Sequence, residues 1–306
     1  MSEKQNFRVG LIGLGAMGLR MGGSLLRAGL TVCGYDIRSE AVESFVKQGG
    51  HKATSAAEAA KDADVLVIVV VNAEQVEDVL FGAGNAAKAL PQGSVVMVCS
   101  TIDPDSAKIN AERLKVMGLE MLDAPVSGGT SRAADGTLSI MAAGAQNAFA
   151  KAQPVMEAMG SNIYNLGESC GLGSMMKTVN QLLCGVHLAV ACEAMAFGAK
   201  AGIDPHLLYE IICNSGGASY VFETHMPHIL KDDYTPYSAV DVFVKDLDIV
   251  LQTGKAHRFP LVTAAAAHQL LVMASGAGYG ELDDAAVVKI FEELLDFKVM
   301  GSCSAQ

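Results

Sequence analysis

Short apolar runs alternate with amphipathic stretches over the first half of the chain. A run of Val, Leu and Ile without polar alternation is typical of a parallel strand that is covered on both faces. The predicted strands are Val9–Ile12, Thr31–Tyr35, Val65–Val71, Val95–Cys99, Glu120–Ala124, Leu138–Ala142 and Asn162–Asn165. The predicted helices between them are the stretch after Gly18, Ala41–Gln48, Glu74–Leu80 and Ser106–Met117. Repeated strand–helix–strand units imply right-handed crossovers and an open, mostly parallel sheet.

The pattern changes near residue 165, because helical periodicity alone continues beyond it. The predicted helices there are Gly173–Lys200, Pro205–Cys213, Ser238–Ala256, Leu261–Ser275 and Asp284–Leu295. We therefore expect a doubly wound α/β domain in residues 1–165 and an all-helical domain in residues 166–306, joined by one long helix.

A glycine-rich turn follows the first predicted strand. Gly13, Gly15 and Gly18 have the spacing G-x-G-x-x-G, and Asp36 ends the second strand. The first glycine permits a tight turn, the second lets backbone approach a pyrophosphate, and the third lets the helix pack closely. In this context the turn predicts a Rossmann-type dinucleotide site. It consists of Gly13, Leu14, Gly15, Ala16, Met17 and Gly18.

Asp36 indicates which dinucleotide is bound. A carboxylate at this position accepts hydrogen bonds from a ribose diol and repels a 2′-phosphate, so the sequence favours NAD over NADP. Arg38 leaves the alternative open, because a guanidinium two positions later can pair with a phosphate or lie in solvent.

Composition narrows the classes of partner. The chain has 306 residues, 51% of them hydrophobic, and a formal net charge of −11. A negative charge of this size argues against nucleic acid or an anionic membrane surface as a partner, while a local pocket can still bind an acidic small molecule. Segment 182–202 is long and apolar, but His187, Glu193 and Lys200 interrupt it, so we expect a helix buried within the protein.

Cysteine and histidine spacing gives no metal site. The seven cysteines form no C-x-x-C pair, which is typical of reduced thiols in a cytoplasmic protein. His225 and His228 are three residues apart, but Pro227 lies between them and no acidic or cysteine partner has metal-site spacing. Met1–Phe7 is short and polar, unlike a signal peptide.

The segment Asp123–Gly129 follows the predicted strand 120–124. In doubly wound folds the carboxyl ends of strands line the ligand crevice. Ser127 offers a hydroxyl, and Gly128 and Gly129 expose N–H groups that can hold a carboxylate. An ordinary surface turn is the alternative.

Two polar residues, Lys177 and Asn180, share one face near the start of the long helix. A helical Lys is usually solvated, but Met175, Met176, Val179 and Leu182 surround this one. Burial and a helix N-terminus both favour the neutral amine, which can accept a proton from a hydroxyl. Lys245 and Asp248 are also three apart, a spacing that on its own indicates no more than a surface ion pair.

Together these segments resemble the β-hydroxyacid dehydrogenase family over nearly the whole chain. The matching motifs are Gly13–Gly18, Ser100-Thr101 before Pro104, Asp123–Gly129 with Gly136-Thr137-Leu138, Gly171-x-Gly-x-x-x-Lys177-x-x-Asn180, and Lys245-Asp246-Leu247. The resemblance implies that Lys177 is the catalytic acid/base and that Asn180 orients the substrate. It implies that Ser127, Gly128 and Gly129 hold the substrate carboxylate, that Thr101 binds cofactor, and that Lys245 contacts cofactor and substrate. It also implies a homodimer or homotetramer formed through the helical domain.

One segment departs from the family. The loop after the third strand usually reads Met/Leu-Pro, and here it is Val70-Val71-Asn72-Ala73, so no cofactor contact is carried over to 71–72. The amino-acid sequences of Cys99–Pro104 and Ser127–Arg132 are most similar to those of the family branch that acts on sugar acids.

The sequence therefore predicts an NAD-dependent dehydrogenase of a small hydroxy acid. The alternatives are an NADPH-dependent semialdehyde or glyoxylate reductase, a 3-hydroxyisobutyrate dehydrogenase, and a dinucleotide-sensing protein without turnover.

Overall fold

The computed structural model describes residues 7–300, so the polar segment 1–6 and Cys303 lie outside the described residues. The chain divides into two compact units, one ending at Lys177 and the other beginning at Thr178. This division falls inside the long helix α9 (Leu172–Lys200), whereas the sequence predicts a boundary ahead of that helix. The first turn of α9 belongs to the first unit because its residues are bonded there, as described below.

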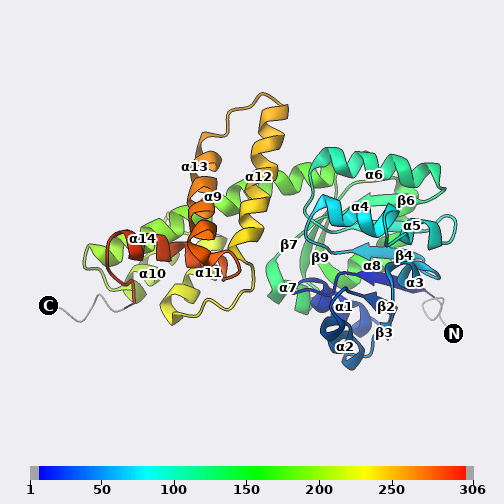
Figure 1. Ribbon diagram of the computed structural model, residues 1–306, viewed down its shortest axis with the longest axis horizontal. Helices are drawn as coiled ribbons and strands as arrows, with labels where there is room; N and C mark the ends of the chain where they lie inside the picture. Colours follow the sequence, from blue (N-terminus) through cyan, green and yellow to red (C-terminus); the bar gives the residue numbers. More distant parts are fainter. Residues whose placement is uncertain (1–6, 301–306) are drawn as a thin grey trace. The chain divides into compact units, whose positions relative to one another are not determined.

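A six-stranded sheet of strand order β3-β2-β1-β4-β5-β6 forms the centre of the first unit (Figure 1). All of its pairings are parallel. The strands are β1 (Arg8–Ile12), β2 (Thr31–Tyr35), β3 (His51–Lys52), β4 (Val65–Ile68), β5 (Val95–Val98) and β6 (Glu120–Asp123). The order reverses between β1 and β4, which is the point at which doubly wound folds bind ligands.

Helices cover both faces of this sheet. One face packs against α1 (Gly18–Arg27), α2 (Ser39–Lys47), α7 (Gly129–Asp135) and α8 (Gln146–Met159). The other packs against α3 (Ala56–Ala60), α4 (Ala73–Phe81), α5 (Ala86–Ala89) and α6 (Pro104–Val116). Residues of β4 alternate between the two cores, with Val65 and Val67 in one and Leu66 and Ile68 in the other. This double burial explains the unbroken apolar runs in the sequence.

Two predicted strands do not join that sheet. Strand β8 (Leu138–Ala142) pairs with both β7 (Val126–Ser127) and β9 (Gly160–Asn165) in a separate three-stranded sheet, so the expectation of one sheet was wrong for β8 and β9. The reason is local, because the chain reverses through β7 and α7 and returns antiparallel to β7. A right-handed crossover onto β6 would need a longer connection.

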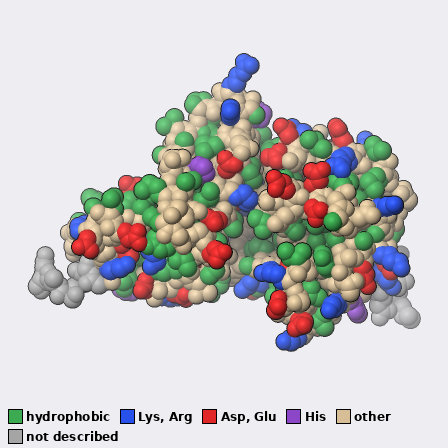
Figure 2. All heavy atoms as spheres, in the orientation of Figure 1, with side chains coloured by type: hydrophobic (Ala, Val, Ile, Leu, Met, Phe, Trp, Pro, Cys, Tyr) green, Lys and Arg blue, Asp and Glu red, His purple; other side chains and the backbone are tan. Residues whose placement is uncertain are grey.

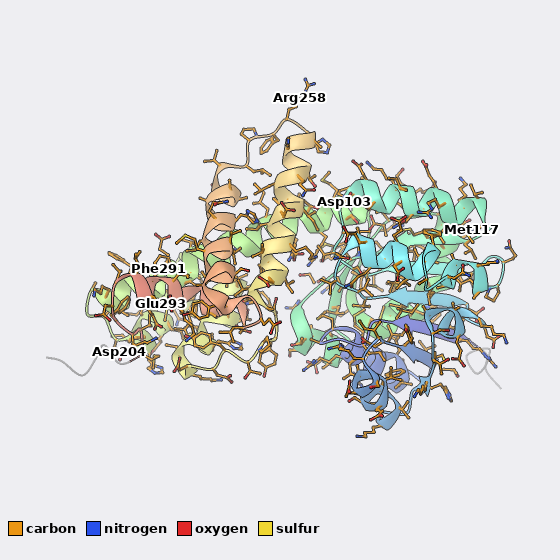
Figure 3. All side chains as sticks on the ribbon, in the orientation of Figure 1. Asp103, Met117, Asp204, Arg258, Phe291 and Glu293 are labelled. Atoms are coloured by element: carbon orange, nitrogen blue, oxygen red, sulfur yellow. The ribbon has the colours of Figure 1, made fainter. Side chains whose placement is uncertain are left out.

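The second unit is helical. Beyond α9 it contains α10 (Pro205–Cys213), α11 (Tyr220–Lys231), α12 (Val240–Ala256), α13 (Val262–Ala274), the short segments η2 (Ser275–Tyr279) and η3 (Asp284–Val287), and α14 (Val288–Leu294). Helices α12 and α13 lie side by side in Figure 1, and Figure 3 labels Arg258 in the connection between them. The sequence pattern did not predict α11, because Pro227 lies inside it.

Helix α9 is long and apolar enough to cross a membrane by length and composition, and it is the one such helix within residues 7–300. Half of its most apolar segment is buried inside the protein. Leu188, Cys192 and Met195 lie in the core of the helical unit, as expected for a helix that organises a protein interior.

Gly173 controls how closely α9 approaches the sheets. A Cβ at this position would overlap the carbonyl oxygen of Asp123 and lie 2.6 Å from that of Met141. Both obstacles are backbone atoms, so neither can rotate away. Gly173→Ala is therefore expected to lower the free energy of unfolding by about 1–3 kcal/mol.

Urea unfolding of Gly173→Ala beside Gly216→Ala measures this effect. A Cβ on Gly216 meets no atom within 4 Å, so that variant should unfold like the wild type. Equal stability of the two variants would show that α9 does not approach the strands so closely.

Candidate active site

The glycine-rich turn has the three properties that a dinucleotide requires. Gly13 has φ of 92°, and a side chain there would overlap the carbonyl oxygen of Val69. A Cβ on Gly18 would overlap the carbonyl oxygen of Gly13, so α1 packs directly on the turn. Around Gly15 the nearest atom to such a Cβ is Nη2 of Arg38, at 3.7 Å. Two glycines are therefore needed for packing, and the middle one leaves room for a pyrophosphate.

Asp36 is hydrogen-bonded to this turn. Its Oδ2 accepts from the Leu14 N–H at 2.7 Å, and its Oδ1 accepts from the Arg38 N–H at 2.9 Å and from Arg38 Nε at 3.1 Å. Burial disfavours the charged form of Asp36, but the hydrogen bonds from Arg38 and Leu14 outweigh it, and the pKa of this carboxyl is lowered. Asp36 is therefore ionised at neutral pH. Arg38, which the sequence left open as a phosphate ligand, pairs here with Asp36.

The loops after β4 and β5 are held together by Ser100. Its Oγ accepts from the Val70 N–H at 2.8 Å, and Ser100 is buried. Thr101 follows and is half-buried, two residues before Asp103, which caps α6 and is labelled in Figure 3 with Met117 at the other end of that helix. Thr101 thus lies at the carboxyl end of β5.

The departure from the family loop has a structural explanation. Asn72 caps α4, because its Oδ1 accepts from the Gln75 N–H at 2.9 Å, and Gln75 Oε1 accepts in turn from the Val71 N–H at 2.9 Å. The arrangement resembles a capping box, except that Gln75 accepts from the residue before the cap. Asn72 and Gln75 start the helix in this chain where the family has a proline.

The carboxylate of Asp123 lies at the N-terminus of α9. It is fully buried, and its Oδ2 accepts from the N–H groups of Gly171 and Ser174, both at 2.8 Å. Its Oδ1 accepts from the Ser174 hydroxyl at 2.6 Å. Burial raises the pKa of Asp123, and these hydrogen bonds oppose that rise. A negative group at this end also interacts favourably with the helix dipole.

Lys177 follows Ser174 by three residues on α9 and is 7% exposed. The neighbouring apolar residues Met176 and Val179 are exposed, so the lysine lies on the buried side of the helix. This inverts the usual arrangement of an amphipathic helix. Asn180 lies three residues further along and is half-buried.

The Ser127–Gly129 loop connects β7 to α7. Gly128 and Gly129 have φ of 132° and 69°, a conformation that successive L-residues rarely adopt. A Cβ on Gly128 would lie 2.7 Å from the Cδ of Arg132, so that side chain covers the loop. Arg132 was not predicted as a site residue, although it ends the Ser127–Arg132 motif. Arg132 belongs to α7, the helix that begins at this loop.

In the helical unit Asn180 is connected to Lys245 through two buried residues. Asn180 Nδ2 donates to Gln181 Oε1 at 2.9 Å, and Gln181 Nε2 donates to Asp246 Oδ2 at 2.5 Å. Lys245 Nζ lies 2.7 Å from the other Asp246 oxygen, an ion-pair contact without hydrogen-bond alignment. Sequence reasoning did not identify Gln181.

The two histidines of α11 each face an aspartate. His225 Nδ1 lies 2.6 Å from Asp284 Oδ1, and His228 Nδ1 lies 3.7 Å from Asp283 Oδ1. Burial lowers the pKa of His225, but its contact with Asp284 outweighs this and the pKa is raised. Over residues 7–300 no group of three or more His, Cys, Asp or Glu side chains is arranged to hold a metal ion.

Comparisons with known proteins agree with this geometry. Residues 8–167 match the NAD binding domain of 6-phosphogluconate dehydrogenase, and residues 171–291 match the NAD-binding family of NADP-dependent 3-hydroxyisobutyrate dehydrogenase. The chain is 50% identical to an L-threonate dehydrogenase of Cupriavidus necator, covering 92% of this chain and 95% of that one. It is 46% identical to an L-threonate dehydrogenase of Escherichia coli K12, covering 95% and 97%.

A solved structure shows the same fold. The crystal structure of a 3-hydroxyisobutyrate dehydrogenase from Salmonella typhimurium superposes with a TM-score of 0.89 at 47% identity, covering 93% of this chain and 99% of that one. The chain belongs to the β-hydroxyacid dehydrogenases of the 3-hydroxyisobutyrate dehydrogenase type. The expected family, fold class, oxidoreductase chemistry, nicotinamide cofactor and small hydroxy-acid substrate are thereby confirmed.

Asp123→Asn tests the anchoring of α9 in this dehydrogenase. The amide is uncharged and has one acceptor oxygen, so we expect the free energy of unfolding to fall by about 1–3 kcal/mol. Turnover should fall too, because Lys177 lies on the first turns of this helix. Urea unfolding and steady-state kinetics measure the two effects.

Asp103→Asn is the matched control. Asp103 caps α6 through one bond from the Ser106 N–H at 2.8 Å, and Asn caps a helix as well as Asp does. This control should resemble the wild type. If Asp123→Asn were as stable and as active as Asp103→Asn, the buried carboxylate would not anchor α9.

Asp36→Ala tests whether Asp36 binds the adenosine ribose of the cofactor. Loss of hydrogen bonds to a charged acceptor should raise the KM for NAD about tenfold or more and change the KM for NADP much less. Asp62→Ala is the control, because it removes another Asp–Arg contact, Arg8 Nη1 to Asp62 Oδ2 at 3.1 Å, on the surface. Equal KM values for both cofactors in Asp36→Ala and Asp62→Ala would remove Asp36 from cofactor selection.

Proposed function

We propose that this dehydrogenase oxidises L-threonate to 2-oxo-tetronate with NAD. The choice of substrate is supported by the similarity of this chain to L-threonate dehydrogenases, at 45–50% identity over more than 90% of both chains. Asp36 supports NAD as the cofactor, because its ionised carboxylate is hydrogen-bonded to the turn where the adenosine ribose would lie.

The substrate carboxylate would bind the Ser127–Gly129 loop. Backbone N–H groups of Gly128 and Gly129 and the Ser127 hydroxyl are suitable donors, and the side-chain stem of Arg132 lies against Gly128. A fixed carboxylate places the neighbouring hydroxyl carbon at a defined position, which is the main contribution that positioning makes to such a reaction.

Lys177 would accept the proton of the reacting hydroxyl at its neutral Nζ. The nicotinamide supplies the hydride acceptor, so the protein has to bind, orient and deprotonate. Asn180, three residues along α9, would hold a substrate hydroxyl. Lys245, on α12, would contact cofactor and substrate. Thr101, at the carboxyl end of β5, would contact the cofactor.

A 3-hydroxyisobutyrate dehydrogenase is the second candidate. It is favoured by the name of the Salmonella typhimurium structure and by 32% identity to the mitochondrial 3-hydroxyisobutyrate dehydrogenase of Mus musculus. The same Lys177 and carboxylate loop would serve either substrate. Turnover of C3–C5 hydroxy acids, with NAD and NADP in parallel, separates the two candidates and the NADPH-dependent reductases.

We also propose a homodimer or homotetramer in the cytoplasm. Exposed apolar residues recur every seven positions along α9, at Met176, Leu183, Val190 and Phe197, which suits a helix that packs against another copy. None of the six cysteines in the described residues forms a disulfide, as is usual in a reducing compartment. On the face that Figure 2 shows, acidic and basic side chains are interspersed, so neither sign of charge forms a separate patch there.

Lys177→Met tests the acid/base role. Methionine fills the space of the buried lysine stem without an amine, so turnover of L-threonate should fall by about 10²–10⁴ while NAD binding is retained. Stopped-flow turnover and NAD titration measure the two quantities.

Lys200→Met, at the other end of α9, is the control and should have wild-type turnover. Its Nζ donates to the Leu295 carbonyl at 3.1 Å, away from the proposed site residues of the same helix. Near-normal turnover in Lys177→Met would exclude Lys177 as the acid/base.

A further inference from the structure

Gln181 is a buried polar residue that follows Asn180 on α9. It is 7% exposed, and its partner Asp246 on α12 is 2% exposed. Burial of a carboxylate and an amide is unfavourable unless both are hydrogen-bonded. Gln181 and Asp246 lie in the helical unit together with Asn180, which donates to Gln181.

Close packing of two helices brings these groups together. A Cβ on Gly185, one turn beyond Gln181, would lie 2.8 Å from side-chain atoms of Leu247, the neighbour of Asp246. Glycine at 185 therefore lets α12 approach α9 at this level. The approach allows Gln181 Nε2 to reach Asp246 Oδ2 at 2.5 Å.

The charge of Asp246 fixes the donor and the acceptor of each hydrogen bond in the series Asn180–Gln181–Asp246. An ionised carboxylate only accepts, so Gln181 must turn its Nε2 toward Asp246. The Gln181 carbonyl Oε1 then faces Asn180 and only accepts, so Asn180 must present its Nδ2. The second contact of Asn180, Nδ2 to Cys184 Sγ at 3.4 Å, also uses the nitrogen. The Asn180 carbonyl Oδ1 is the side-chain atom left to accept from a ligand.

We propose that Gln181 is a positioning residue that transmits the polarity of Asp246 to Asn180, so that Asn180 offers an acceptor to a substrate hydroxyl. The proposal rests on the proposed function, in which Asn180 holds a substrate hydroxyl. A free asparagine side chain presents either oxygen or nitrogen after a flip of the amide. The chain from Asp246 removes that freedom, and a hydroxyl O–H that faces Asn180 meets an acceptor.

Asp246 thereby has two separate roles. One oxygen contacts Lys245 Nζ at 2.7 Å, and the other accepts from Gln181. The first contact would act on cofactor and substrate through Lys245, whereas the second acts on the substrate alone, through Asn180. A change at Gln181 should therefore affect the substrate and leave the KM for NAD unchanged.

A double-mutant cycle tests the proposal. The variants are Gln181→Met, Asn180→Ala and the double variant, with kcat/KM for L-threonate measured at saturating NAD. Gln181→Met should lower kcat/KM about tenfold, the value of one ordinary hydrogen bond, with the KM for NAD unchanged. In the Asn180→Ala background the same change should have no further effect, because Gln181 acts through Asn180.

Gln252→Met is the matched control. Gln252 Nε2 donates to Asp248 Oδ2 at 2.6 Å on the exposed side of α12, so the same substitution removes a Gln–Asp bond remote from Asn180. Its kcat/KM should equal that of the wild type. An equal loss from Gln181→Met in both backgrounds would overturn the proposal, because a purely structural role predicts additivity. A folded Gln181→Met variant with unchanged kcat/KM would overturn it too.

Two further measurements keep the result decisive. If Gln181→Met does not fold, Asp246→Asn replaces it, and its loss must be smaller in the Asn180→Ala background than in the wild type, since any effect through Lys245 is additive. If the wild-type protein oxidises no L-threonate, the proposed function fails separately. In that case the Tm of the same single and double variants is measured without substrate, which tests the Asn180–Gln181 hydrogen bond. Additive Tm shifts would overturn the proposal.

Discussion

The buried carboxylate of Asp123 is the contact on which the proposed catalytic residues depend. It ends β6 and binds the first turn of α9, so one residue connects the sheet to the helix that carries Lys177 and Asn180. A helix begins with unpaired N–H groups, and the Asp123 carboxylate accepts from those of Gly171 and Ser174 and from the Ser174 hydroxyl. Gly173 allows this contact, because a side chain there would displace the helix from the carbonyl oxygens of Asp123 and Met141.

The position of Lys177 follows from this anchor. It lies one turn beyond Ser174, on the side of α9 that is buried, while Met176 and Val179 are exposed. A lysine side chain is rarely buried to this extent unless it has a partner. The sequence indicated this inversion, since Lys177 stands in an apolar stretch, but it could not show which side of the helix is covered.

Features that depend on residues close together along the chain could be predicted from the sequence. The turn Gly13–Gly18 and Asp36 have fixed spacing along the chain, and in the structure Asp36 is hydrogen-bonded to Leu14 of that turn. Contacts between distant segments left no such signal. Residues 138–142 were correctly predicted as a strand but assigned to the wrong sheet, because pairing with β7 depends on a reversal at Gly128 and Gly129. Helix α11 was missed because Pro227 is tolerated within it.

Gln181 shows most clearly why part of the site could not be predicted. Next to Asn180 in the sequence, it resembles any polar residue on a long helix, and the approach of α12 at Gly185 gives it a charged partner, Asp246. Its importance depends on the charge of Asp246, which lies 65 positions away along the chain. A buried carboxylate only accepts hydrogen bonds, so it orients each amide that follows it. The chemistry of Asn180 is therefore determined by a residue that it does not contact.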